Sequence, residues 1–157
     1  MISNHFTAET QSEPTITEDD SWVYALWKWA DENRVPDLFS RHEDGSGYWV
    51  GIPRDKDRLF ALRALFLKRL RLTQLPDAIG YLTNLREIYV ENNQLTDLPD
   101  SIGNLVNLMH LDVHNNHLNR LPDSLGSLTN LRGLYCEENQ LTSLPESFGN
   151  LTNLRWI

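Results

Sequence analysis

"LREIYVENNQLTDLPDSIGNLVN", residues 85–107, is the stretch that decides the fold, because the chain repeats it. It is followed without a gap by "LMHLDVHNNHLNRLPDSLGSLTN", residues 108–130, and by "LRGLYCEENQLTSLPESFGNLTN", residues 131–153. A more degenerate copy, "LRALFLKRLRLTQLPDAIGYLTN", occupies residues 62–84, and a further one begins as "LRWI" at residues 154–157. Copies that start at residues 62, 85, 108, 131 and 154 share a period of 23 residues. Self-similarity at a fixed period predicts a repeat architecture in which every copy forms one structural unit.

Each copy has the pattern of a short strand followed by a return path. In Leu108-x-x-Leu111-x-Val113, alternation along a strand points Leu111 and Val113 to one side and Asp112 to the other. Ordering the backbone of one copy costs more free energy than its apolar side chains recover by burial, so a single copy cannot fold alone. We therefore expect the copies to stack, with their strands paired in a parallel sheet.

The motif L-x-x-L-x-L-x-x-N-x-L resembles that of the leucine-rich repeat family, and the resemblance extends over residues 62–157. The second half of each copy is similar to the 23-residue type found in intracellular and bacterial members. The resemblance implies an α/β solenoid, a horseshoe arc with a curved parallel sheet on its concave face. It also implies an asparagine ladder, in which Asn93, Asn116 and Asn139 satisfy backbone groups of adjacent coils. Leu70 takes this place in the first coil.

Proline and glycine recur in the return path of every copy. We expect the prolines to fix φ where the chain leaves the turn. The glycines are expected to supply backbone freedom to the turns; they are Gly80, Gly103, Gly126 and Gly149.

Residues 1–61 lack the repeat and are expected to cover its open end. Residues 1–17 are polar and aperiodic, which predicts a disordered tail. Residues 18–61 are predicted to form a small, mostly helical N-terminal cap, because a terminal coil otherwise exposes apolar surface and unpaired strand groups. An alternative interpretation is a ligand pocket lined by the tryptophans of this region, Trp22, Trp27, Trp29 and Trp49.

Two helices are expected in the cap. The first begins at Asp20 or Ser21 and places Trp22 and Trp29 on one apolar face, with Leu26 between them and Ala25 alongside. The second lies within "IPRDKDRLFAL", residues 52–62, with Pro53 near its first position. Between them we expect a loop with a short extended piece at residues 48–50.

Strand positions between the buried leucines form columns on the concave face, and they vary from copy to copy. Because the scaffold positions are constant and these are not, we expect the columns to carry specificity for a protein partner. Aromatic members are the expected anchors, since they bury a large area at low entropic cost. The candidate partner-binding residues are Phe66, Lys68, Glu87, Tyr89, Glu91, His110, Asp112, His114, Tyr135, Glu137 and Trp156.

The row "HLDVHNNH", residues 110–117, raises the alternative of a metal site. On a strand, His110, Asp112 and His114 share one face, but His110 and His114 are too far apart for one ion. A cluster of His114 with Glu91 and Glu137 of adjacent coils is better placed, although such charges are more often solvated or ion-paired. We therefore expect no metal and no other cofactor.

Charge and composition favour protein partners over other classes. The formal net charge is −8, which disfavours nucleic acid and anionic membranes as partners. The first residues have no pattern of a Sec signal peptide, and the single Cys136 fits a reducing compartment. We therefore expect a cytoplasmic protein, of bacterial type by its repeats, with secretion as an effector by a non-Sec route left open.

Catalysis is not expected from this chain. It contains none of the common phosphate-binding, nucleophile-elbow or zinc-protease motifs, and Cys136 occupies the core position of Val90 and Val113. The alternative to a module acting alone is the recognition segment of a truncated larger protein, linked to a ubiquitin ligase or a GTPase. Since "LRWI" stops within a strand, self-association through an uncapped C-terminal edge is a further expectation.

Overall fold

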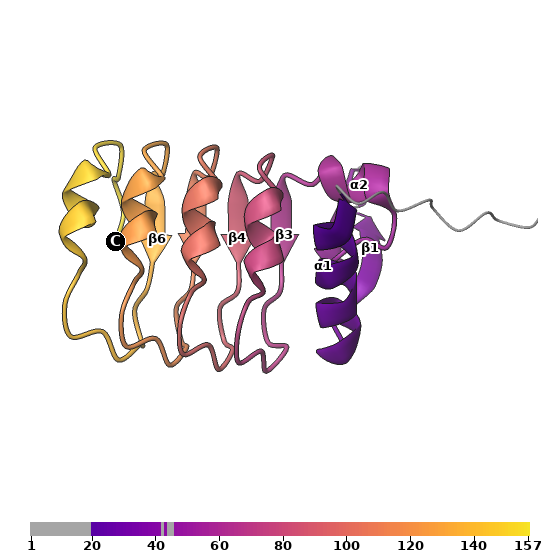
Figure 1. Cartoon of the computed structure of the whole chain (residues 1–157), viewed down its shortest axis with the longest axis horizontal. Helices are drawn as coiled ribbons and strands as arrows, with labels where there is room; N and C mark the ends of the chain where they lie inside the picture. Colours follow the sequence, from indigo (N-terminus) through magenta and orange to yellow (C-terminus); the bar gives the residue numbers. More distant parts are fainter. Residues whose placement is uncertain (1–19, 42, 44–45) are drawn as a thin grey trace, which may run out of the picture.

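The computed structural model describes residues 20–41, 43 and 46–157. The tail expected at residues 1–17 lies outside the described residues. The repeats form a stack of coils in which strands line one side and short 3₁₀ helices line the other, with the cap at the N-terminal end (Figure 1).

Each coil contributes one three-residue strand to a parallel sheet. The strands are β3 (Ala64–Phe66), β4 (Glu87–Tyr89), β5 (His110–Asp112) and β6 (Gly133–Tyr135). Leu65 pairs with Ile88, Ile88 with Leu111, and Leu111 with Leu134, so the sheet register follows the 23-residue period. All four of these side chains are fully buried. The predicted solenoid and its parallel sheet are confirmed.

The return path of each coil is a five-residue 3₁₀ helix. These helices are η2 (Asp77–Tyr81), η3 (Asp100–Asn104), η4 (Asp123–Ser127) and η5 (Glu146–Asn150). A proline precedes each one with extended backbone, as at Pro99 with φ −67° and ψ 144°. Proline therefore ends the extended segment, and its missing N–H falls where no sheet partner is needed.

Three of the four repeated glycines, Gly80, Gly103 and Gly126, allow close approach between coils, and the expectation that they supply backbone freedom was wrong. Gly51 is the only described glycine with a positive φ. A Cβ at Gly103 would lie 2.6 Å from the carbonyl oxygen of Ser124, and Gly80 and Gly126 meet the next coil equally closely. Adjacent 3₁₀ helices thus pack backbone against backbone, which leaves no room for a side chain.

The predicted asparagine column lies between coils and bonds to both. The Asn93 side chain donates to the carbonyls of Leu67 (2.9 Å) and Val90 (2.8 Å) and accepts from the backbone N–H of Leu72 (3.0 Å). Asn116 and Asn139 repeat this arrangement one and two coils later. The Asn93 side chain also accepts from the backbone N–H of Leu70. The turn of the first coil therefore has its hydrogen bonds, although Leu70 occupies the asparagine position of that coil.

A second asparagine column was not anticipated. From the second coil on, an asparagine precedes the first leucine, and its side chain donates to a carbonyl about one period earlier in the chain, as in Asn107 to Thr83 at 2.9 Å. The other members are Asn84, Asn130 and Asn153. For Asn84 this carbonyl is that of Phe60 in the cap. The signal was present in the sequence, since these residues recur with the same period.

The cap is less helical than expected, because a β-hairpin lies between its helices. The elements are α1 (Ser21–Glu32), β1 (Asp37–Arg41), β2 (Gly47–Gly51) and α2 (Lys56–Phe60). β1 pairs antiparallel with β2, and β2 joins β3 in parallel through Val50 and Phe66. The cap therefore extends the repeat sheet to the strand order β1 to β6 and covers the edge of the first coil.

Two details of the cap correct the sequence expectations. The buried face of α1 consists of Val23, Leu26 and Ala30 with Trp29, whereas Ala25 is exposed. The second helix begins after Asp55, whose carboxylate accepts from the backbone N–H of Arg58, so Pro53 lies outside it.

Candidate protein-interaction surface

The sheet register places the predicted concave residues in columns. One column contains Glu87, His110 and Gly133, with Trp156 attached to Gly133 by an isolated bridge. The next contains Phe66, Tyr89, Asp112 and Tyr135. All of these but Gly133, which is buried, remain at least partly accessible. These side chains therefore share one face of the molecule, since they occupy matching positions on paired strands.

Aromatic rings stack across the strands of this face. The Phe66 and Tyr89 rings are parallel, with their centroids 4.9 Å apart. Tyr48, on β2, lies against Phe66 with a centroid separation of 5.0 Å. We call Tyr48, Phe66 and Tyr89 the aromatic column. Sequence reasoning missed Tyr48, because only the pairing of the hairpin with the first coil brings it beside Phe66.

The aromatic column ends at a hollow of about 380 Å³, which is lined by Glu87, Tyr89, His110, Asp112 and Tyr135. Gly133 lies next to two of these lining residues, and a Cβ on it would come within 2.9 Å of His110 Nδ1. The absence of a side chain at Gly133 thus leaves room for His110 and Tyr135 to lean over this position. Two carboxylates and two phenol rings converge on the hollow, a combination suited to a partner's basic or amphipathic side chain.

Two carboxylates line the hollow, and they contribute to the shifted pKa of Tyr89. Burial and the hydrogen bond that its hydroxyl donates to Glu87 (3.0 Å) raise the pKa of Tyr89 to about 12, with further contributions from the charges of Glu87, Asp112 and Glu91. Burial and the nearby carboxylates disfavour the phenolate, so Tyr89 stays a neutral donor at physiological pH.

His114 contacts a carboxylate of its own coil, and not Glu91 or Glu137 of the adjacent coils as expected. Its Nδ1 lies 2.7 Å from the Asp112 carboxylate, and Asn92 approaches its Nε2 at 3.4 Å. Glu91 is buried and faces Lys68 instead, with 3.8 Å between Nζ and the carboxylate. Among the described residues, no three His, Cys, Asp or Glu side chains lie close enough together to hold a metal ion.

The residues one position after Lys68, Glu91, His114 and Glu137 share an unusual backbone conformation. Asn92 and Asn115 have φ near the left-handed value, at 59° and 50°, and so do Arg69 (59°) and Glu138 (53°). Asparagine tolerates this region better than other side chains, so two coils have a favoured residue there and two do not. These residues lie three positions beyond the end of each strand, where the chain turns.

The tryptophans of the cap do not form a common pocket. Trp22 stacks on Tyr81 of the first coil with centroids 5.1 Å apart, and Trp27 donates to the carbonyl of Pro53 at 2.8 Å. Trp29 is buried, whereas Trp49 lies on the hairpin beside Phe39. Trp22 therefore joins the cap to the first coil, Trp27 joins two segments of the cap, and Trp29 belongs to the core.

Cys136 is half-buried and packs against the core, as its position in the repeat predicts. Burial, and secondarily the charge of Glu137, raise the pKa of its thiol. A thiol held in the neutral form is a poor nucleophile.

Stacked coils with an asparagine column and a leucine core define the leucine-rich repeat class of solenoid protein. A family model described as "Leucine-rich repeat region" matches residues 54–157, and the chain belongs to this family. Domains of this kind generally mediate protein–protein interaction and are generally not catalytic. No curated protein sequence is significantly similar to the chain.

Solved structures with a similar fold come from bacteria and from a plant. A leucine-rich repeat protein of Leptospira interrogans is 32% identical with a TM-score of 0.58, over 64% of this chain and 26% of its own. An internalin from Listeria monocytogenes is 24% identical with a TM-score of 0.54, over 69% and 32%. The BIR2 ectodomain from Arabidopsis thaliana is 26% identical with a TM-score of 0.50, over 58% and 50%.

The chain thus spans between a quarter and a half of the length of these proteins. Within the part of the chain that the structure describes, no helix has the length and apolar character to cross a membrane.

Proposed function

We propose that the chain is a protein–protein interaction module that binds its partner through the concave face of the sheet and catalyses no reaction of its own. The observation that carries this proposal is the aromatic column, which runs across three strands and ends at the hollow beside Tyr135. Accessible aromatic rings on a rigid sheet are typical anchors of protein interfaces, because little entropy is lost when a partner covers them.

The charges on this face indicate which partner surface fits. Glu87 and Asp112 line the hollow. Glu137 is exposed further along the same face. A partner that presents an apolar patch with a basic side chain would complement both the rings and the carboxylates.

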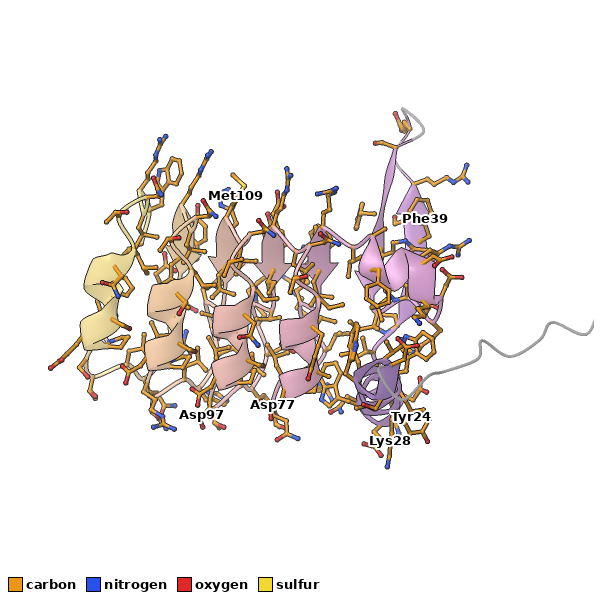
Figure 2. All side chains as sticks on the ribbon, turned by 45° about the horizontal axis from the view of Figure 1, so that its top comes forward. Tyr24, Lys28, Phe39, Asp77, Asp97 and Met109 are labelled. Atoms are coloured by element: carbon orange, nitrogen blue, oxygen red, sulfur yellow. The ribbon has the colours of Figure 1, made fainter. Side chains whose placement is uncertain are left out.

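A mutational comparison tests the proposal. Partners are captured with the wild-type chain, and the dissociation constant of each purified partner is then measured for Tyr89→Ala/Tyr135→Ala. The double variant should weaken binding by about 2 kcal/mol or more, since two interface aromatics are truncated. Tyr24→Ala is the matched control, because Tyr24 is an exposed tyrosine on α1 (Figure 2).

Unchanged affinity in a double variant with wild-type circular dichroism would refute use of the concave face. Light scattering on the complex distinguishes a foreign partner from a second copy of this chain, which the strand edge near Trp156 could accept.

A second candidate is that the same face selects targets for a larger protein that carries a ubiquitin ligase or GTPase domain. The greater length of the solved relatives supports a larger protein, without indicating which further domain it carries. Sequencing the gene on both sides of the present reading frame tests this candidate, which fails if no further domain is encoded.

A further inference from the structure

A column of arginines follows the rim of the sheet, one residue before the concave columns. It consists of Arg63, Arg86, Arg132 and Arg155, with Met109 in the middle place. The backbone N–H of each member donates to the carbonyl of the member before it. Arg86 donates to Arg63 (2.7 Å) and Met109 to Arg86 (2.7 Å), and Arg132 and Arg155 continue the series. All four arginines are exposed. Figure 2 labels Met109 on this rim and Asp77 and Asp97 on the opposite one.

None of these four arginines forms an ion pair with a described residue, and the same holds for Arg34, Arg41, Arg69 and Arg71. The other six lysines and arginines are paired. Arg54 pairs with Asp31 at 2.6 Å and Arg120 with Asp97 at 3.3 Å, and Lys28, Lys56 and Lys68 are paired as well. Among the described residues, no ion pair or hydrogen bond involves an arginine side chain of the rim. The nearest column contains one carboxylate, Glu87, which accepts the Tyr89 hydroxyl. Like charges on adjacent strands, about 4.8 Å apart, repel each other unless an anion lies between them.

At the cap end, the rim continues into an aromatic cavity. A space of about 360 Å³ lies beside Arg63 and is lined by Phe39, Trp49 and Arg58, among others. An adjoining space of about 260 Å³ is lined by Phe39, Arg41, Trp49 and Arg58. The Arg58 guanidinium lies 5.3 Å from the Trp49 ring centre, and Arg58 also approaches Asp55 at 4.0 Å. Phe39 is 42% exposed, and Figure 2 places it on the same rim as Met109.

We infer that this rim is a second interaction surface, which binds an extended acidic segment of a protein with an apolar side chain at one end. The apolar side chain would enter the cavity at Phe39 and Trp49, and the carboxylates that follow would pair with the arginine column. From Arg63 to Arg155 is four strand spacings, or about 19 Å, which an extended peptide covers with about six residues.

An acidic protein segment suits the rim better than nucleic acid does. The chain as a whole carries −8, and a long polyanion would extend over its other, acidic surfaces, whereas a short peptide need not. The site shares Tyr48 with the aromatic column, whereas Phe39, Trp49 and the rim arginines lie outside that column. Substitutions of the rim arginines therefore test the site separately from the function proposed for the concave face.

Fluorescence anisotropy with a labelled peptide of one tryptophan followed by six glutamates tests the inference. The comparison is between the wild-type chain and Arg86→Gln/Arg132→Gln/Arg155→Gln. The control is Lys28→Gln/Arg71→Gln/Arg120→Gln, which changes the net charge equally away from the rim. The rim variant should bind about tenfold more weakly and the control within about twofold of wild type.

Three further measurements decide the inference. The matching peptide with six glutamines should not bind. Phe39→Ala should weaken binding of the glutamate peptide without changing the circular dichroism spectrum of the protein. Equal weakening by rim and control variants would show that only net charge matters and would overturn the inference. Tighter binding of a hexathymidylate than of the acidic peptide would overturn the assignment to a protein segment.

Discussion

At the scale of single residues, the backbone conformation just beyond each strand determines which residue types are favoured there. Glu138 has φ 53°, a value that costs most side chains about 1–2 kcal/mol, whereas asparagine bonds locally and tolerates it. Asn92 and Asn115 occupy the same position in the preceding coils, and Asn115 donates to the Asn92 side chain at 2.9 Å. A glutamate at this exposed position is therefore less stable than an asparagine would be, which indicates that it serves something other than stability.

We predict that Glu138→Asn raises the free energy of unfolding by about 0.5–1 kcal/mol. The matched control is Glu137→Asn, which removes the same charge from an exposed neighbour without positive φ. Urea denaturation of the two variants gives the comparison. An equal gain in both would mean that charge, and not backbone strain, limits stability here.

The Tyr89 hydroxyl leads to a prediction about alkaline stability. A pKa raised from 10.0 to about 12 means that between these values the unfolded chain has lost a proton that the folded chain keeps. The stabilising contribution of the neutral phenol is therefore fully present below pH 10 and is lost as the pH rises toward 12. Tyr89→Phe should lose less stability than wild type between pH 9 and pH 11 in urea denaturation, whereas Tyr24→Phe should behave as wild type.

At the scale of elements, the distance between coils is set by the return helices. Gly80, Gly103 and Gly126 allow each 3₁₀ helix to contact the serine of the next, and the serine hydroxyls at Ser101 and Ser124 are buried without a hydrogen-bond partner among the described residues. Adjacent 3₁₀ helices thus stack as closely as the strands do on the other side.

We predict that Gly103→Ala lowers the free energy of unfolding by about 1–3 kcal/mol, because the new Cβ would overlap the Ser124 backbone. Gly149→Ala has the same chemistry in η5, but nothing lies within 4 Å of its Cβ position, so its effect should stay within about 0.5 kcal/mol. Thermal denaturation of both variants distinguishes packing from helix propensity. Similar losses would contradict the packing explanation.

At the scale of the whole molecule, each coil is stabilised by contacts with its immediate neighbours. Each 3₁₀ helix makes its main contacts in the described part of the chain with the 3₁₀ helices of adjacent coils, and α1 contacts η2, so interior units are supported on two sides. In η5 no residue is buried, and Leu144 is 48% exposed. Cooperativity between nearest neighbours should therefore weaken toward residues 141–157.

Hydrogen exchange followed by mass spectrometry should show this gradient directly. Amides in residues 141–157 should exchange well before those of residues 85–128, because local opening there breaks fewer buried contacts. Uniform exchange across the repeats would instead indicate a single cooperative unit.

The sequence by itself determined the coil, its period, the sheet register and the columns of the concave face. It could do so because a gapless repeat of leucines imposes one conformation on every copy, so that matching positions must lie side by side. The strand positions of variable residues such as Tyr89 and Tyr135 follow from the same period, and their role in partner binding stays a prediction.

The tertiary structure alone decided what depends on contacts between unlike segments. The hairpin brings Tyr48 to Phe66 and Phe39 toward the arginine rim, and no periodicity relates these residues. His114 contacts Asp112 of its own coil and not a carboxylate of a neighbouring coil, which depends on side-chain rotamers that the repeat pattern does not specify. The role of Gly103 is settled by the distance between two backbones, which a one-dimensional pattern does not contain.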